Sequence, residues 1–80
     1  MKISILFFGM ARDLVDNSSL EIKLPSKSTV ASFKEFLSNE FPELQKMSSY
    51  AVAINQNYAT DETLIQENDI IAIIPPVSGG

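Results

Sequence analysis

The chain has 80 residues, a formal net charge of −4 and 45% hydrophobic residues, which suits one small domain with a small core. It contains neither cysteine nor histidine, which excludes a disulfide framework, a cysteine nucleophile and a zinc site built from these ligands. The six basic residues are scattered along the sequence, and this distribution does not resemble a nucleic-acid-binding surface.

The sequence also gives no sign of a membrane segment. No part of it approaches the roughly 20 consecutive apolar residues that a membrane-spanning helix needs. The apolar run Ile3–Phe8 is broken by Ser4 and is soon followed by Arg12, so it is too short for a signal peptide. We therefore expect a cytoplasmic protein that binds neither membranes nor nucleic acid.

The first part of the chain predicts two strands joined by a long connection. Residues 2–8 are rich in isoleucine and phenylalanine, which is typical of a strand. Residues 20–24 alternate strictly between apolar and polar side chains, which predicts a half-buried second strand. We expect residues 9–17, between these strands, to form a loop with a short apolar insert at Leu14 and Val15.

One helix is predicted in the middle of the chain. Ser28 or Thr29 is suited to cap its first turn. Apolar residues then follow at spacings of three, four and four, which places one stripe along a helix: Val30, Phe33, Leu37 and Phe41. Pro42 disfavours helical geometry at the preceding residue and ends the helix there. Leu44 and Met47 indicate one further turn.

The second half of the chain predicts more strands. Residues 51–54 and 70–74 are apolar runs that predict strands, and residues 58–59 are expected to add a very short one. Leu64 is expected to fill the core from a turn segment. Asn68 lies in a polar turn just before the last strand, where asparagine can adopt the left-handed conformation.

Together these elements predict an α+β domain of the ubiquitin-like β-grasp type. One main helix can cover one face of a small mixed sheet of four or five strands. In this fold the first and last strands run parallel at the centre of the sheet. We expect residues 1–75 to form the domain and residues 76–80 to form a flexible C-terminal tail.

The central strands are expected to carry apolar side chains on both faces of the sheet. Because side chains alternate across a strand, Ile3, Ile5 and Phe7 would face the helix and their neighbours would face away. The uncovered face would then carry a contiguous patch of Leu6, Phe8, Ala72 and Ile74. Such an exposed patch usually marks an interaction surface. The alternatives are that the sheet curls over these side chains or that residues 9–17 cover them.

The last six residues are the most distinctive part of the sequence. Pro75 and Pro76 fix φ near about −65° and lack backbone donors, which predicts the end of the strand and a stiff stalk. Gly79 and Gly80 have no side chain, so their backbone can enter a narrow slot. We expect the chain to present a carboxylate at Gly80 to another protein's active site; the alternative is a frayed terminus. No basic residue follows Lys46, so this carboxylate would be attracted to a basic pocket on a partner.

These residues closely resemble the MoaD family, the small sulfur-carrying subunits of molybdopterin synthase. The specific feature is the ending Pro-Pro-Val-Ser-Gly-Gly, because a bare Gly-Gly end is shared by ubiquitin and several other carriers. The other matching stretches are residues 5–8 with Arg12 and Leu14, residues 53–56, and residues 70–74. The resemblance spans nearly all of the chain.

The resemblance implies that the chain carries sulfur at Gly80. An ATP-using, E1-like adenylating enzyme would convert the Gly80 carboxylate to an acyl-adenylate, and a sulfur donor system would then leave a thiocarboxylate. The tail would insert into the large synthase subunit through Pro75, Pro76, Val77, Ser78 and Gly79. There the sulfur would attack a cyclic pyranopterin monophosphate and build the dithiolene of molybdopterin.

The resemblance also implies a heterotetrameric complex in which the small and large subunits have different roles. The chain would bind no cofactor and no metal, and it would hold no complete active site, because the substrate pocket would belong to the large subunit. Five residues are expected to contact this partner: Leu6, Phe8, Arg12, Ala72 and Ile74. Arg12 matches a family position and could pair with a partner carboxylate, although an isolated surface arginine is otherwise unremarkable. Tyr50 and Tyr58 are expected to pack against strands.

Three other functions remain open at this point. A sulfur carrier for thiamine or tRNA thiolation would use the same tail chemistry with a different acceptor. A protein modifier would instead join Gly80 to a target lysine through an isopeptide bond. A plain interaction domain would have no tail chemistry at all. The Pro-Pro-Val element favours the molybdopterin synthase subunit over these three.

Overall fold

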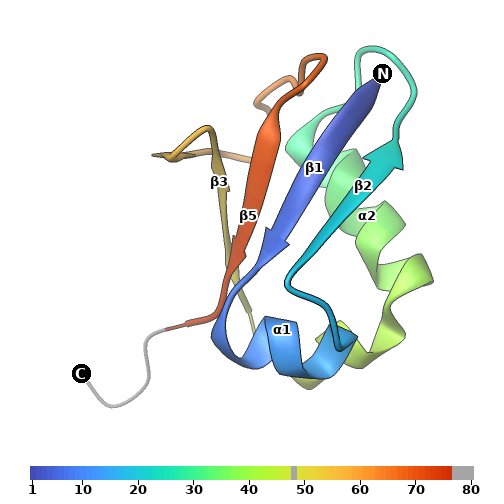
Figure 1. Ribbon diagram of the computed structural model, residues 1–80. Coiled ribbons are helices and arrows are strands. Elements are labelled where there is room, and N and C mark those ends of the chain that lie inside the picture. Colours follow the sequence, from blue (N-terminus) through green and yellow to red (C-terminus); the bar gives the residue numbers. More distant parts are fainter. Residues whose placement is uncertain (48, 77–80) are drawn as a thin grey trace.

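The computed structural model describes residues 1–47 and 49–76, and in it a five-stranded mixed sheet packs against a helix (Figure 1). The elements are β1 (Lys2–Phe7), α1 (Gly9–Val15), β2 (Ser19–Lys23), α2 (Val30–Glu40), the 3₁₀ helix η1 (Pro42–Lys46), β3 (Ala51–Ile54), β4 (Asn57–Tyr58) and β5 (Ile70–Ile74). The strand order is β2-β1-β5-β3-β4, and β1 and β5 are parallel while the other neighbouring pairs are antiparallel. The predicted α+β arrangement, with the first and last strands parallel at the centre, is confirmed.

The main helix α2 begins and ends where the sequence predicts. Thr29 is its N-cap, and the Ser32 backbone N–H donates to Thr29 Oγ1 at 3.2 Å. The Thr29 N–H donates in return to Ser32 Oγ at 3.0 Å, which completes a capping box. The helix ends at Glu40, because Pro42 starts the separate helix η1. Phe41, between the two helices, packs edge-on against Phe7 with ring centroids 5.8 Å apart.

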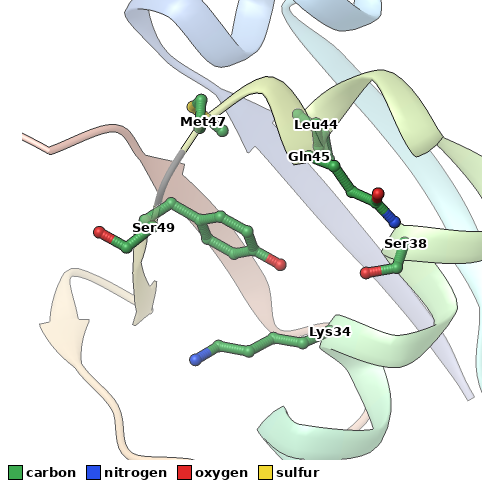
Figure 2. Close-up of a pocket in the computed structure, with 7 residues that line it drawn as sticks. Lys34, Ser38, Leu44, Gln45, Met47 and Ser49 are labelled. Carbon is green, nitrogen blue, oxygen red and sulfur yellow. The ribbon is translucent and has the colours of Figure 1, made fainter.

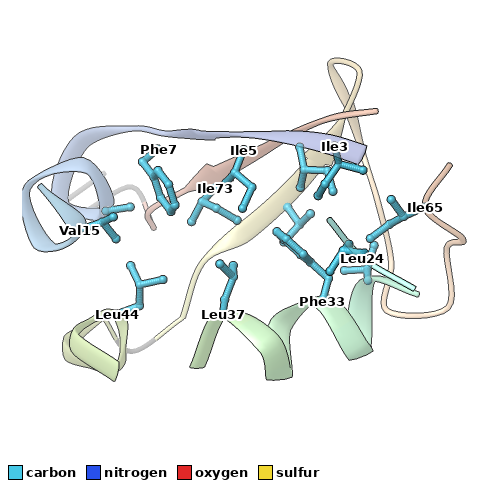
Figure 3. Packing of buried hydrophobic residues seen from close by; sticks show 14 of the residues in the cluster. Ile3, Ile5, Phe7, Val15, Leu24, Phe33, Leu37, Leu44, Ile65 and Ile73 are labelled. Carbon is cyan, nitrogen blue, oxygen red and sulfur yellow. The ribbon is translucent and has the colours of Figure 1, made fainter. Parts of the chain in front are cut away.

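The core lies between α2 and one face of the sheet (Figure 3). The helix contributes Val30, Phe33 and Leu37, and the two central strands contribute Ile3, Ile5, Phe7, Ile71 and Ile73. All eight are at most 2% exposed. Burial of a side chain of this size stabilises the fold by about 1.5–3 kcal/mol, so these residues dominate its stability.

The connection between β1 and β2 is a short helix, α1, so the prediction of a loop there was wrong. Ala11 and Val15 of α1 are buried in the core, on the side of the sheet that α2 covers. The helix has no side-chain cap and only these two buried residues, which is too weak a pattern to identify it from sequence. It ends at Asp16, which adopts the left-handed conformation with φ of 61°. Because α1 packs into the core, it does not cover the opposite face of the sheet.

One smaller detail in the second half of the chain also differs from the sequence prediction. Leu64 is 56% exposed, and its neighbour Ile65 is buried in the core in its place. Leu64 forms an isolated antiparallel bridge with Thr29, and Ile65 donates its N–H to the Ser28 carbonyl at 2.9 Å. In an extended segment of this kind neighbouring side chains point to opposite sides, so Leu64 faces outward while Ile65 faces the core.

A polar network fixes the start of β5. The Asn55 side-chain amide donates to Asp69 Oδ1 at 2.9 Å, and the Gln66 N–H donates to Asp69 Oδ2 at 2.8 Å. The Ile70 N–H then donates to Asn55 Oδ1 at 3.0 Å. Asn68, in the same turn, has φ of 68°, so its predicted left-handed conformation is confirmed. The network sets the register of β5, and this register decides which of its residues face away from the core.

Candidate functional site

The face of the sheet opposite α2 carries a contiguous set of apolar side chains, which we call the open face. The strand register places Leu6 beside Ala72, Ala72 opposite Ala53, and Ala53 opposite Tyr58. Residues paired in this way project on the same side of a sheet, so the four form one row across it. The open face comprises this row and the apolar residues beside it: Leu6, Phe8, Ala53, Tyr58, Ile70, Ala72 and Ile74.

Side chains of different size make a groove on the open face. The small residues Ala53 and Ala72 form its floor, and larger side chains rise around them, including Phe8, which is 48% exposed, and Ile70, which is 47% exposed. The groove has a volume of about 560 Å³. The predicted exposed patch is therefore present, and neither curling of the sheet nor the β1–β2 connection hides it. Its role as a partner interface stays a prediction.

Three members of the open face were absent from the predicted interface: Ala53, Tyr58 and Ile70. Alternation along β5 already placed Ile70 on this side, so its signal was present in the sequence. Tyr58 was assigned to strand packing, which is wrong, because its side chain is 78% exposed and lines the groove. The cause is the turn at Asn55 and Gln56, whose φ values of 50° and 74° start β4 one residue earlier than predicted.

Arg12 does not join the open face. It lies on α1, is exposed, and lines a separate shallow pocket with Asp13, Asp16, Asn17 and Ser18. This pocket shares no residue with the groove on the open face. The structure therefore brings together four of the five residues predicted for the interface, and contact between Arg12 and a partner stays a prediction.

The open face leads directly to the C-terminal segment. Ile74 is the last residue of β5 and lines the groove, and the half-buried Pro75 and the exposed Pro76 follow it. The prolines end the strand, as the sequence predicts. The remaining predicted tail residues, Val77, Ser78, Gly79 and Gly80, lie outside the described residues.

A second depression lies on the other side of the molecule, between α2, η1 and the start of β3 (Figure 2). It has a volume of about 310 Å³ and is lined by Lys34, Ser38, Leu44, Gln45, Met47, Ser49 and Tyr50. Lys34 Nζ lies 2.9 Å from Asp61 Oδ1 and 5.8 Å from the centroid of the Tyr50 ring. Burial, and then the negative charge of Asp61, raise the pKa of Tyr50 above its ordinary value. Among these lining residues, only Lys34 is charged, and its ammonium group is paired with Asp61.

Residues 1–47 and 49–76 hold neither a metal-binding cluster nor a membrane-spanning helix. This part of the chain has no cluster of three or more histidine, cysteine, aspartate or glutamate residues that could hold a metal ion. Its helices are also too short and too polar to cross a membrane.

Comparison with known sequences identifies relatives that align over the whole of this chain. The model of the ThiS family matches residues 5–80. The chain is 41% identical over 81 residues to the molybdopterin synthase sulfur carrier subunit of Arabidopsis thaliana, with 100% of this chain and 84% of the plant protein covered. It is 30% identical over 83 residues to the subunit of the same name from Drosophila erecta, with 100% of this chain and 92% of the fly protein covered.

Comparison with solved structures identifies the fold. SAMP1, a small archaeal modifier protein from Haloferax volcanii, matches with a TM-score of 0.86 at 19% identity over 100% of both chains. A structure of the complex between subunits 1 and 2 of molybdopterin-converting factor from Helicobacter pylori matches with a TM-score of 0.72 at 24% identity, again over 100% of both chains. Matches at such low identity show the fold alone. That fold is the predicted ubiquitin-like β-grasp, which is thereby confirmed.

Proposed function

The chain belongs to the ThiS family, and we propose that within this family it is the sulfur carrier subunit of a molybdopterin synthase. The observation that carries the proposal is the alignment with a plant subunit of that name, which spans the whole chain at 41% identity. The chain's own residues agree with it. They combine an uncovered apolar face, a strand that leads from this face into two prolines, and a Gly-Gly sequence after them.

The proposed chemistry takes place at the Gly80 carboxylate. A carboxylate is a poor electrophile, so an E1-like enzyme would first use ATP to form an acyl-adenylate at Gly80. Sulfur from a donor system would then displace AMP and leave a thiocarboxylate, whose sulfur is the nucleophile. Two such transfers to a cyclic pyranopterin monophosphate would build the dithiolene. This chain would supply the sulfur, and its partner would supply the substrate pocket and the acid–base groups.

The open face would dock on the large subunit while the tail enters its active site. The five residues from Pro76 to Gly80 can span roughly 17 Å when extended, which is enough to reach a buried pocket beside the docking surface. The fold likeness to one chain of the Helicobacter pylori complex supports a partner subunit of this kind. A carboxylate at the end of an acidic segment would also favour a basic pocket on that partner.

The same tail could serve other acceptors, and the names of the relatives favour one of them without excluding the others. The name of the ThiS family and the fold likeness to SAMP1 do not by themselves separate a sulfur carrier from a protein modifier. The name shared by the plant and fly relatives favours molybdopterin synthase. We therefore keep the thiamine or tRNA carrier and the modifier as outcomes of the experiment below.

The intact mass of the chain, isolated from its own cells, tests the proposal. We expect a fraction of molecules that end at Gly80 and are heavier by the difference between a sulfur and an oxygen atom. A covalent conjugate with a second protein would instead indicate a modifier. Only unmodified chain, even in cells that are making molybdopterin, would contradict a carrier function. Transfer of the sulfur to the pyranopterin by the purified large subunit then separates the proposed acceptor from thiamine and tRNA.

A further inference from the structure

The corner between β1 and α1 lies against the point at which the chain leaves the sheet. The Phe8 N–H, just after β1, donates to the Ile73 carbonyl at 3.3 Å. Gly9, the first residue of α1, has φ of 51°. A Cβ placed on Gly9 would lie 3.4 Å from Pro75 Cγ and 4.0 Å from Pro75 Cδ. These are ordinary van der Waals distances, so a Cβ at position 9 would just touch the Pro75 ring, and only atoms beyond Cβ that point toward the ring would overlap it.

We infer that Gly9 is a positioning residue for sulfur transfer, because its bare backbone forms the surface on which the base of the tail rests. This inference rests on the proposed function. Because a Cβ at position 9 would already touch the Pro75 ring, the γ carbons of a β-branched side chain would press on the ring wherever they point toward it. Since proline has a fixed φ, a displaced ring redirects the residues that follow it. Gly9 thus acts through Pro75 and does not itself touch the reacting atoms.

The same corner also links the tail to the docking surface. Phe8 contributes its ring to the open face, and Gly9 comes directly after it. One short segment therefore holds both an anchor for the partner and the surface beneath the first residue of the tail. With the open face docked, the position of Pro75 decides where the tail begins. A misplacement of about 1 Å can lower a reaction rate on the order of a hundredfold.

Two valine substitutions test this inference as a matched pair. Gly9→Val and Lys27→Val both place a β-branched residue at positive φ, since Lys27 has φ of 66°. Lys27 is exposed and precedes α2, so only Gly9→Val adds atoms beside Pro75. We expect both variants to lower Tm by about 5 °C or more. We expect Gly9→Val alone to lower the single-turnover rate of sulfur transfer, by about tenfold or more, when the large subunit is saturating. The Kd of its complex with the large subunit should be unchanged.

A double-mutant cycle with Pro75→Ala identifies the contact responsible. Without the proline ring, a side chain at position 9 has nothing to displace, so Gly9→Val should lower the rate no further in the Pro75→Ala background. Additive losses would overturn the inference. A Gly9→Val rate equal to that of Lys27→Val, or a loss explained entirely by weaker binding of the large subunit, would also overturn it.

Gly9→Asn keeps the test decisive if the valine variant fails to fold. Asparagine tolerates positive φ, yet its Cβ would touch the Pro75 ring and it adds further atoms beside it. We expect a lower transfer rate with little change in Tm, and a wild-type rate would contradict the inference. The wild-type chain in the same assay distinguishes a failure of the proposed function from a failure of the role of Gly9. If it transfers no sulfur to the pyranopterin, the proposed function fails; if it does and the variants match it, only the role of Gly9 fails.

Discussion

The two faces of the same sheet are built from similar residues but have opposite surroundings. Ile73 is fully buried beneath α2, whereas its neighbour Ile74 faces away from the core and lines the groove. Ile5 and Leu6 on β1 show the same contrast. The chemistry of the side chains does not distinguish the two faces; the presence of a helix over only one of them does. The covered face therefore stabilises the domain, while no helix of the described residues covers the open face.

The largest effect should come from a charge introduced on the two faces in turn. Ile73→Asp places a carboxylate in the core without a partner, which costs several kcal/mol and is comparable with the total stability of a small domain, about 5–15 kcal/mol. We expect this variant to be unfolded at room temperature. Ile74→Asp should retain the wild-type circular dichroism spectrum and a Tm close to that of the wild type, because its carboxylate can reach water.

The same pair distinguishes docking from stability. We expect Ile74→Asp to weaken the complex with the large subunit strongly, since docking would desolvate the new charge. Titration calorimetry on the folded Ile74→Asp protein measures this loss. If Ile74→Asp unfolds as completely as Ile73→Asp, the open face is part of the core and the contrast between the faces is wrong. If it folds and binds normally, the partner uses another surface.

The smallest effect concerns Tyr50, which lies just before β3 and is partly buried against the core. Burial and the charge of Asp61 raise its pKa above the ordinary value of 10.0, so the folded chain holds this proton more tightly than the unfolded chain. The stability gained in this way is fully present below pH 10 and is lost as the pH rises through the folded-state pKa. We expect wild-type stability to fall more steeply above pH 10 than that of Tyr50→Phe.

Urea unfolding of the two proteins at a series of pH values measures this difference. Asp61→Asn serves as a control, because it removes the lesser cause of the shift and leaves the burial of Tyr50 in place. It should reduce the pH dependence without abolishing it. Identical pH profiles for the wild type and Tyr50→Phe would show that folding does not raise the pKa of Tyr50.

Most of the architecture was predictable because its signals are strong and local. The apolar runs of β1 and β5 identified the two strands, and the geometric alternation of side chains along a strand then assigned their residues to the two faces of the sheet. The stripe on α2 with Thr29 and Pro42 identified the helix and its ends. The helix α1 was missed because it has no capping side chain and only two buried residues. Tertiary packing stabilises a helix this short, and a single sequence does not record that packing.

The candidate site was predictable only in part, for a related reason. Alternation placed Leu6, Ala72 and Ile74 on one face, but the contribution of Tyr58 depends on a turn with two residues at positive φ. Arg12 was associated with the patch by family resemblance, and helix α1 places it in a different pocket. The contact between Gly9 and Pro75 joins residues far apart in sequence, so only the folded structure reveals it.

Deletion of Gly80 is the measurement that tests the central claim most directly. The shortened chain should fold with unchanged Tm and should still bind the large subunit, because the open face is intact. Sulfur transfer to the pyranopterin in a reconstituted synthase should nevertheless be abolished, since the reacting carboxylate would no longer belong to Gly80 or reach the same position. Sulfur transfer at the wild-type rate by the shortened chain would contradict the claim that this residue carries the sulfur.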